Sequence, residues 1–486
     1  MTALSLLPEI IKVTNRKGAD KMKTWKQLFI RHGWLLQSIS ENEFVTTQES
    51  KENIEFLLES LKKANVDHFY DGKHLILNRK PINEQKWIDV LSFENRGRTE
   101  SIGVFNEDAP ILRQLDTYIS GIVRQLNRLG FKTIASCDGH NRRAAYISIS
   151  NDSNVDELVE MLIAIGFGKV YYREGNNSIH IHLPYNIFQA HQVEKREELL
   201  LIAEKLSVVE KDWLDKGHPY IREQIFYHEL EKVLSIPGSS GNEGEIRQFV
   251  IEQIRPYVDH LTVDRYGNIL AEKTYRSGNG PTILLNAHLD TIEEIAPDRS
   301  ILKNGGIWSS SEGILGADDR AGVAILLHLA KYLPETNFSG KVKFIFTVEE
   351  EIGLVGARHI DEYFLWGVDA AIVCDRRGTN DIVVSCGGLY SFCEESYGKF
   401  FEEVANKHQL GNWKCTAGGS SDTRIWAEHG IQSVNLSVGY GNEHTHDEYL
   451  DVAATYNTVK LLLTVFQEAK QLKRMIRNIN RSKKLA

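Results

Sequence analysis

The ten residues PTILLNAHLD, 281–290, decide the fold of the second half of the chain. Their apolar core lacks polar alternation, which is typical of a strand buried on both faces. Helical segments such as GADDRAGVAILLHLAKYL (316–333) separate this stretch from similar ones: KVKFIFTVEEE (341–351), VDAAIVCD (368–375) and QSVNLSVGY (432–440). Buried strands alternating with helices predict an α/β domain, a mostly parallel sheet with helices on both faces, over about residues 223–472.

Acidic and histidine side chains follow these strands where each one ends. They are His288 and Asp290, Asp318 and Asp319 before a helix, Glu349 to Glu351, Asp375, and His444 and His446 in GNEHTHDEYL. Functional sites of open α/β sheets form at the carboxyl ends of the strands. Carboxylates gathered there would repel one another and take up protons, unless divalent cations lie between them. Histidine and carboxylate are common zinc ligands, and this set is large enough for two metals sharing a bridging carboxylate.

Each of these features has a structural alternative when taken alone. A His-x-Asp at a strand end is more often structural, a run of three Glu is usually a solvated face, and an Asp before a helix commonly caps it. The occurrence of all five segments in one predicted sheet favours a metal centre over five separate structural roles.

The motifs NAHLD, GADDRAG, TVEEEIGLVGA, VCD, GGSSDTR and HTHDEYL occur in the order and spacing of a known family. Over about residues 223–472 the chain resembles the co-catalytic zinc peptidases, which include peptidase T, the glutamyl aminopeptidases and the acetylornithine deacetylases. The resemblance implies a zinc-exopeptidase fold and two divalent metals, zinc with cobalt or manganese as alternatives. It implies that His288 and Asp375 hold one metal, that Asp318 bridges both, and that Glu351 and His444 hold the other.

The resemblance also implies two further roles. Glu350 takes the place of the general base, and Asp290 that of the acid that orients His288. The family's Ile-Gly after the base and ligand leaves Glu349 outside the site, and the spacing to Glu448 selects His444, with His446 as the alternative ligand. A hydroxide bridging the metals would attack the scissile amide.

The expected substrates are short peptides. Ser421, Asp422 and Arg424 in GGSSDTR, residues 418–424, are candidate substrate contacts, although a polar turn explains them equally well. Only 27 residues separate Asp290 from Asp318 and 68 separate Asp375 from His444, too few for the lid or inserted domains of the relatives. This compact form favours an aminopeptidase. The alternatives are a dipeptidase, an amidohydrolase of acylated amino acids, and a non-catalytic or RNA-related protein with a passenger hydrolase domain.

The remaining segments carry weaker signals. We expect a mainly helical region with a short strand or two over residues 1–95 and a small α+β domain of the split βαβ, ferredoxin-like kind over 96–185. A connecting helix over 186–222 and a basic tail over 473–486 complete the chain. In the small domain, Cys137, Asp138 and His140 are weak candidates for metal or substrate binding, and His180 and His182 alternate on one strand.

Bulk properties limit the remaining classes. The chain has 486 residues, a formal net charge of −9 and five cysteines, none in a CxxC pair. No apolar run reaches the length of a membrane span, and no signal peptide is evident. We therefore expect a cytoplasmic protein without membrane contact. The acidic balance argues against nucleic-acid binding. Homo-oligomers remain an open alternative.

Overall fold

The computed structural model describes residues 23–93, 96–97, 110–139, 144–167, 170–176, 178–183 and 192–485. These residues form two compact units, one ending at Ile225 and the other beginning at Phe226. The boundary lies inside helix α7 (Gly217–Leu234). Each unit has a hydrophobic core of its own and is described by itself.

The second unit is built on a sheet with a parallel centre. Its strands follow the order β17-β16-β19-β15-β11-β14-β10-β9, and β18 pairs with β16. The four central strands are mutually parallel, as the sequence predicts: β14 (Gly340–Thr347), β11 (Thr282–His288), β15 (Ala370–Arg376) and β19 (Gln432–Ser437). Antiparallel strands flank them: β10 (Ile269–Tyr275) and β9 (His260–Val263) on one side, β16 (Asp381–Cys386) and β17 (Tyr390–Ser391) on the other. Strand β18 (Lys414–Gly418) is parallel to β16.

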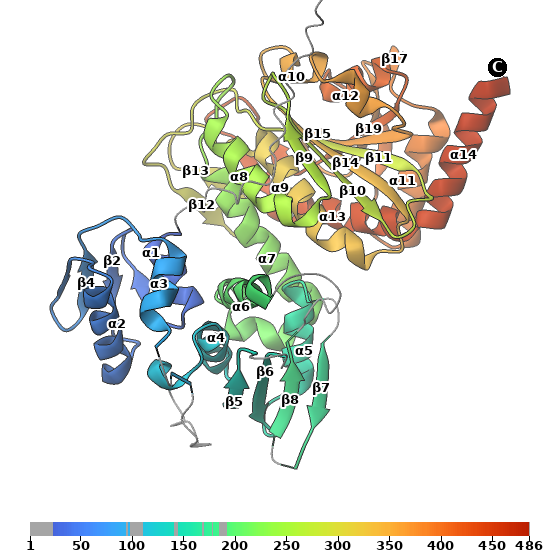
Figure 1. Ribbon diagram of the computed structural model, residues 1–486. Helices are drawn as coiled ribbons and strands as arrows, with labels where there is room; N and C mark the ends of the chain where they lie inside the picture. The colour runs from blue at the N-terminus through green and yellow to red at the C-terminus, as the bar shows by residue number, and fades with distance from the viewer. Residues whose placement is uncertain are drawn as a thin grey trace, which may run out of the picture. The chain divides into compact units, whose positions relative to one another are not determined.

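Helices cover both faces of this sheet (Figure 1). Successive residues of β11 show why: Ile283 and Leu285 belong to the large core cluster, whereas Leu284 belongs to a smaller one. The large cluster includes side chains from α7, α8 (Gly244–Ile254), α9 (Ala317–Tyr332), α11 (Glu395–Lys407), α13 (Val452–Gln467) and α14 (Ala469–Leu485). The smaller cluster packs α10 (Val355–Arg358) and α12 (Asp422–Glu428) on the opposite face.

A second, small sheet joins two of the segments that deliver acidic and histidine side chains. It has the order β12-β13-β21-β20, with β12 (Ile301–Asn304), β13 (Ile307–Ser310), β20 (Tyr440–Gly441) and β21 (Tyr449–Asp451). Strand β13 pairs with β21, so the loop containing His444 is tied to the segment that precedes Asp318. The short interval between Asp290 and Asp318 therefore contains a hairpin and no inserted domain.

The first unit begins with more strands than we expected. It contains α1 (Trp25–Arg31), α2 (Lys51–Lys63) and α3 (Glu84–Leu91), but also the antiparallel sheet β1-β2-β4-β3. The expectation of a mainly helical region with a strand or two understated this sheet. The strands are β1 (Gln37–Ser38), β2 (Glu43–Val45), β3 (His68–Tyr70) and β4 (His74–Leu77), each too short to show a period of two along the sequence.

The second part of this unit has the predicted helix-hairpin-helix-hairpin order. Helix α4 (Ser120–Leu129) precedes β5 (Thr133–Cys137) and β6 (Tyr146–Ser150), and α5 (Val155–Ala164) precedes β7 (Tyr171–Glu174) and β8 (Ser178–His182). The sheet order is β5-β6-β8-β7, with every neighbouring pair antiparallel. Strand β8 lies between β6 and β7, which is the split βαβ arrangement that the sequence predicts.

One expectation about helices was wrong. The described residues 192–222 do not form a single connecting helix: α6 (Gln192–Leu206) ends before a 3₁₀ segment, Lys211–Lys216, and α7 begins at Gly217, which has a φ of 76°. The basic stretch near the C-terminus is the end of a helix, since α14 continues to Leu485 and buries Leu472, Ile476 and Ile479.

Two further features bear on the protein's class. All five cysteines are free thiols. Within the described ranges, every helix is too short or too polar to cross a membrane.

Candidate metal centre

The first group of possible ligands lies at the carboxyl ends of two parallel strands. His288 ends β11, Asp375 lies near the end of β15, and Asp318 is in the first turn of α9. The Nε2 atom of His288 is 3.1 Å from Asp318 Oδ1 and 3.7 Å from Asp375 Oδ1. One ligand atom from each of the three residues lies within 4.8 Å of the others. This spacing suits a single cation held by one imidazole and two carboxylates.

The second group uses the other oxygen of Asp318. His444 Nε2 lies 3.2 Å from Asp318 Oδ2 and 2.8 Å from Glu351 Oε2. These three residues again place one ligand atom each within 4.8 Å of the others. His446, in contrast, is 72% exposed and its Nε2 atom lies 3.5 Å from Glu293, outside both groups. The two histidines of HTHDEYL therefore have different surroundings, and only His444 lies beside the acids.

The chemistry of these donors fits divalent cations. Burial, with the nearby charges of Asp318 and Asp375, raises the pKa of Glu351 to about 8. Burial also raises the pKa of Asp375, and Asp318 adds to the effect. The Oε1 atom of Glu351 is buried and has no hydrogen-bond partner. An unpartnered carboxylate oxygen among buried acids needs a positive partner, and a cation between the acids supplies it.

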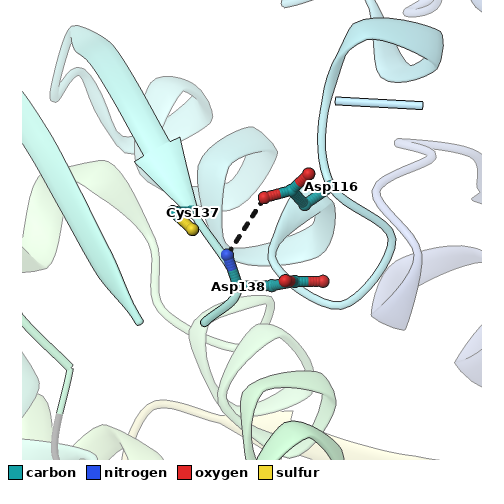
Figure 2. Close-up of side chains that lie close together, drawn as sticks. All are labelled: Asp116, Cys137 and Asp138. Atoms are coloured by element: carbon teal, nitrogen blue, oxygen red, sulfur yellow. Dashed lines mark hydrogen bonds between the residues drawn. The ribbon is translucent and has the colours of Figure 1, made fainter. Parts of the chain in front are cut away.

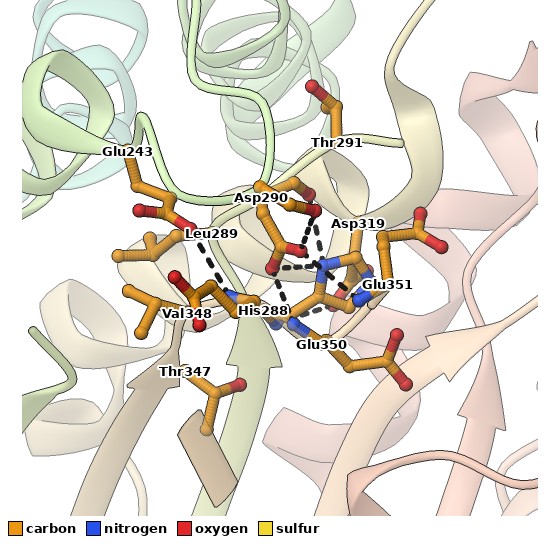
Figure 3. A network of polar contacts seen from close by, with 12 residues as sticks. Glu243, His288, Leu289, Asp290, Thr291, Asp319, Thr347, Val348, Glu350 and Glu351 are labelled. Carbon is orange, nitrogen blue, oxygen red and sulfur yellow. Dashed lines mark hydrogen bonds and ion pairs between the residues drawn. The ribbon is translucent and has the colours of Figure 1, made fainter. Parts of the chain in front are cut away.

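Asp290 connects His288 to the loop of three glutamates (Figure 3). The Nδ1 atom of His288 lies 3.0 Å from the main-chain oxygen of Asp290 and 3.4 Å from its Oδ1. The same carboxylate accepts the backbone N–H groups of Glu350 at 3.0 Å and Glu351 at 3.1 Å, and the Ser240 hydroxyl at 2.7 Å. Asp290 thus orients more than the histidine: it also fixes the backbone that presents Glu350 and Glu351.

The three consecutive glutamates lie in three different environments. Glu349 has a φ of 52°, and its N–H donates to Oε1 of the buried Glu243 at 3.2 Å. Glu351 belongs to the second ligand group. Glu350 lies between them, and burial together with the charges of Asp375 and other nearby carboxylates raises its pKa to about 10. Divalent cations bound beside these carboxylates would offset their charges and lower this pKa, which would leave Glu350 ionised as a general base requires.

Two buried residues, Glu448 and Tyr440, hold the possible ligands in position. The sequence offers little indication of this supporting role. Glu448 accepts the backbone N–H of Gly316 at 2.7 Å and of Asp318 at 3.0 Å, so it fixes the turn that carries Asp318. The Tyr440 hydroxyl donates to Asp375 Oδ1 at 2.9 Å. In the sequence, Glu448 served only as a spacing marker for His444, and Tyr440 is one more apolar-aromatic residue at the end of a strand.

The residues of GGSSDTR have distinct surroundings. Ser421 is buried and caps α12 by accepting the N–H of Thr423. Asp422 is buried as well, and its Oδ2 accepts the Thr347 hydroxyl at 2.5 Å. Arg424 is half-exposed and pairs with Glu428 at 2.9 Å. Their expected contacts with substrate stay predictions, and the first two residues already have structural roles.

The first unit contains another group of acids and a thiol, Asp116, Cys137 and Asp138 (Figure 2). The N–H of Asp138 donates to Asp116 Oδ2 at 3.2 Å. The buried guanidinium of Arg96 interacts electrostatically with both acids. This cation already compensates the two carboxylates, so the group has a structural explanation. His140, the third member of the predicted set, lies outside the described residues.

Comparisons with known proteins agree with the predicted resemblance. The sequence profile of the M42 glutamyl aminopeptidases matches residues 302–461. A putative aminopeptidase of Acetivibrio thermocellus is 25% identical over 331 residues, which cover 50% of this chain and 99% of that protein. The cytosol non-specific dipeptidase of Escherichia coli is 28% identical over 172 residues, covering 33% of this chain and 35% of that one. The solved structure of aminopeptidase PepT from Bacillus cereus aligns with 51% of this chain and 99% of its own, with a TM-score of 0.47 and 18% identity.

Proposed function

From the premise that its second half is a metallopeptidase domain related to the M42 glutamyl aminopeptidases, we propose that this protein is an aminopeptidase that uses two metal ions to hydrolyse short peptides. Zinc is the metal we propose, because one imidazole and two carboxylates per site match its preferences. The cytoplasm is the compartment we propose, because free thiols persist in a reducing environment.

One observation carries this proposal: the carboxylate of Asp318 faces two separate ligand groups, one with each oxygen. Its Oδ1 lies beside His288, and its Oδ2 lies beside His444. A single structural ion would need only one of these groups. A carboxylate shared between two ligand groups is the arrangement expected for two metals that act on one bond.

Metal ions held there would supply a water of lowered pKa and would polarise the scissile carbonyl. The protein's own side chains do the rest. Glu350 takes a proton from the attacking water and passes it to the leaving amine. Asp290 holds the backbone of Glu350 and Glu351 in place through its two oxygens. The Tyr440 hydroxyl holds the carboxylate of Asp375, and Glu448 fixes the backbone that carries Asp318.

The choice of an aminopeptidase over other exopeptidases is supported by the compactness of the domain. A small hairpin, β12 and β13, occupies the interval between Asp290 and Asp318, and no further domain is inserted there. A dipeptidase is the second candidate, because the E. coli dipeptidase is among the similar proteins. An amidohydrolase that acts on acylated amino acids is a third candidate. Its substrates differ from those of an aminopeptidase because they have no free amine.

The deciding experiment measures metal content and turnover together. The purified chain is assayed against amino-acid anilides, dipeptides and N-acyl amino acids, with the variants Glu350→Gln and Glu349→Gln in parallel. We expect anilide cleavage, metal retained in both variants, and a loss of about 10²–10⁴-fold in kcat for Glu350→Gln only. Glu349→Gln is the matched control, because it removes the same charge from the neighbouring position.

Three results would count against the proposal. Normal turnover in Glu350→Gln would reject the general base. Cleavage of N-acyl amino acids without cleavage of anilides would replace the aminopeptidase with the amidohydrolase. A chain that hydrolyses none of the three substrate classes when loaded with zinc, cobalt or manganese would reject the enzyme itself.

A further inference from the structure

The sheet β5-β6-β8-β7 in the first unit has two unlike faces. One face is apolar: Ile147 and Ile149 of β6 and Ile179 and Ile181 of β8 are buried in the core of the unit. The residues between them point the other way, because neighbouring residues of a strand alternate between faces. Directly paired residues share a face, so the pairing register defines the second face completely.

This second face, which we call the ring face, carries rings and a cation. One row across it contains Cys137, Tyr146, His182 and Tyr171, and the next contains Ala135, Ser148, His180 and Arg173. Every position in both rows is neutral or basic at its side chain, and the only charged member of the eight is Arg173. The positive charge of the ring face therefore lies at its β7 edge, where Arg173 is, whereas at the β5 edge the acids Asp116 and Asp138 lie beside Cys137.

The rings of the ring face lie next to one another and reach solvent. The rings of Tyr146 and His180 have centroids 4.4 Å apart, and those of His180 and His182 lie 4.8 Å apart. His180 is held by the Ser148 hydroxyl, 3.0 Å from its Nδ1 atom. Tyr171 on the edge strand β7 is 65% exposed, and Arg173 on the same strand is exposed as well. His182 on the neighbouring strand β8 is also exposed. Burial is the main cause that lowers the pKa of His180, and the neighbouring His182 and Arg173 add to it, which agrees with a shared face.

We propose that the ring face binds single-stranded RNA, with bases stacked on Tyr171 and His182 and a phosphate paired with Arg173. Flat rings on an open sheet face offer stacking surfaces to unpaired bases, and such stacking tolerates any base sequence. Arg173 has no acid beside it among the eight described residues of the two rows, so its charge can pair with a phosphate of the backbone. RNA is the nucleic acid that presents unpaired loops and ends in the cell, whereas cellular DNA is mostly duplex. This proposal revises the expectation, drawn from net charge alone, that nucleic acid does not bind.

The test uses the full chain and a fluorescently labelled 12-nucleotide RNA of mixed sequence, followed by fluorescence anisotropy at two salt concentrations. The variants are Tyr171→Ala and Arg173→Gln. Their matched controls are Tyr172→Ala, on the opposite face of the same strand, and Lys51→Gln, an exposed cation on α2. Thermal melting of each variant checks that the fold is retained.

We expect Tyr171→Ala to weaken RNA binding about fivefold or more, since one stacked base contributes at least that factor. Arg173→Gln should weaken it and lower the salt dependence, with a change in log–log slope of about 0.7. Neither control should change affinity by more than about twofold, in line with ordinary surface substitutions.

Three outcomes would overturn the proposal. One is the absence of RNA binding by the wild-type chain up to ~100 µM, the weak end of non-specific affinity. The second is an equal loss in face and control variants, which would assign any binding to another surface. The third is binding of single-stranded DNA or of an acidic peptide as tightly as RNA, which would mean that the face selects charge alone. The peptidase assay is separate, so failure here leaves the proposed hydrolase unaffected.

Discussion

Removing single ligands should change the number of metal ions bound per chain in a pattern fixed by Asp318. This residue contributes one oxygen to each ligand group, whereas Asp375 belongs only to the first group and Glu351 only to the second. The variants Asp375→Ala, Glu351→Ala and Asp318→Ala therefore remove one ligand from the first group, from the second group, and from both.

The expected stoichiometries follow from ligand counts. A zinc ion with four ligands can take three from the protein and one from a water molecule. Each group here offers three protein ligands. We expect about two ions per chain in the wild type and about one in Asp375→Ala and Glu351→Ala, because the untouched group keeps its full set. Asp318→Ala leaves two protein ligands in each group, so we expect it to retain well under one ion per chain.

The assay is elemental analysis by mass spectrometry after the protein is loaded with zinc and passed through a desalting column. Glu349→Ala and His446→Ala serve as controls, because both residues lie outside the two groups and carry similar chemistry. Two ions retained in Asp318→Ala would refute the bridging role. A loss of both ions in Asp375→Ala would also contradict it, since the second group would then depend on a residue that it does not contain.

Three further outcomes are expected. His444→Ala should lose one metal ion and at least 10²-fold in kcat, whereas His446→Ala should keep two metal ions and normal turnover. If elemental analysis and activity show the larger defect in His446→Ala, the ligand is His446 and not His444. Glu448→Ala leaves the N–H groups of Gly316 and Asp318 without their acceptor, so zinc affinity should fall about 10–100-fold in a chelator competition. An unchanged zinc affinity would show that the turn before α9 keeps its conformation without Glu448. Burial opposes ionisation of Glu84, but the nearby His32 and the Arg31 guanidinium, which donates to both carboxylate oxygens, outweigh it and lower its pKa to about 2, below the ordinary 4.5. Burial lowers the pKa of His32, so Arg31 is the partner whose positive charge persists as the pH rises. The ionised carboxylate therefore stabilises the first unit above about pH 4.5, by up to about 3 kcal/mol, and this stabilisation is lost as the pH falls towards 2. Urea unfolding followed by tryptophan fluorescence should give a wild-type advantage over Glu84→Gln at pH 7 that shrinks at pH 3; an equal difference at both pH values would contradict the mechanism.

The parallel centre of the second unit was predictable because apolar strands are separated by helices. Thr282–His288 and Ala370–Arg376 each contain an apolar run without alternation. The same strands end in acids or histidine, so the sequence also indicated which edge of the sheet carries the ligand groups. The small strands of the first unit escaped prediction, because two to four residues are too few to establish a period.

The arrangement of supporting side chains required the folded chain. Glu448 and Asp318 are 130 residues apart in sequence and meet only because β13 pairs with β21. Likewise, Glu243 fixes the backbone of Glu349 across 106 residues, which separates three identical side chains into three environments. In the sequence, only the family's Ile-Gly after the run distinguishes its members; the folded chain gives each of them a different environment.

The sequence by itself determined which residue types end the central strands, since burial demands apolar strands and the chemistry of the site demands charged ends. The family resemblance suggested Asp318 as a shared ligand, but only the tertiary structure supplied its distances to both groups. The structure alone showed that rings and a cation share one face of the sheet β5-β6-β8-β7. Distances of a few ångströms between residues far apart in sequence depend on strand pairing and helix packing, and these interactions have no local signature in the chain.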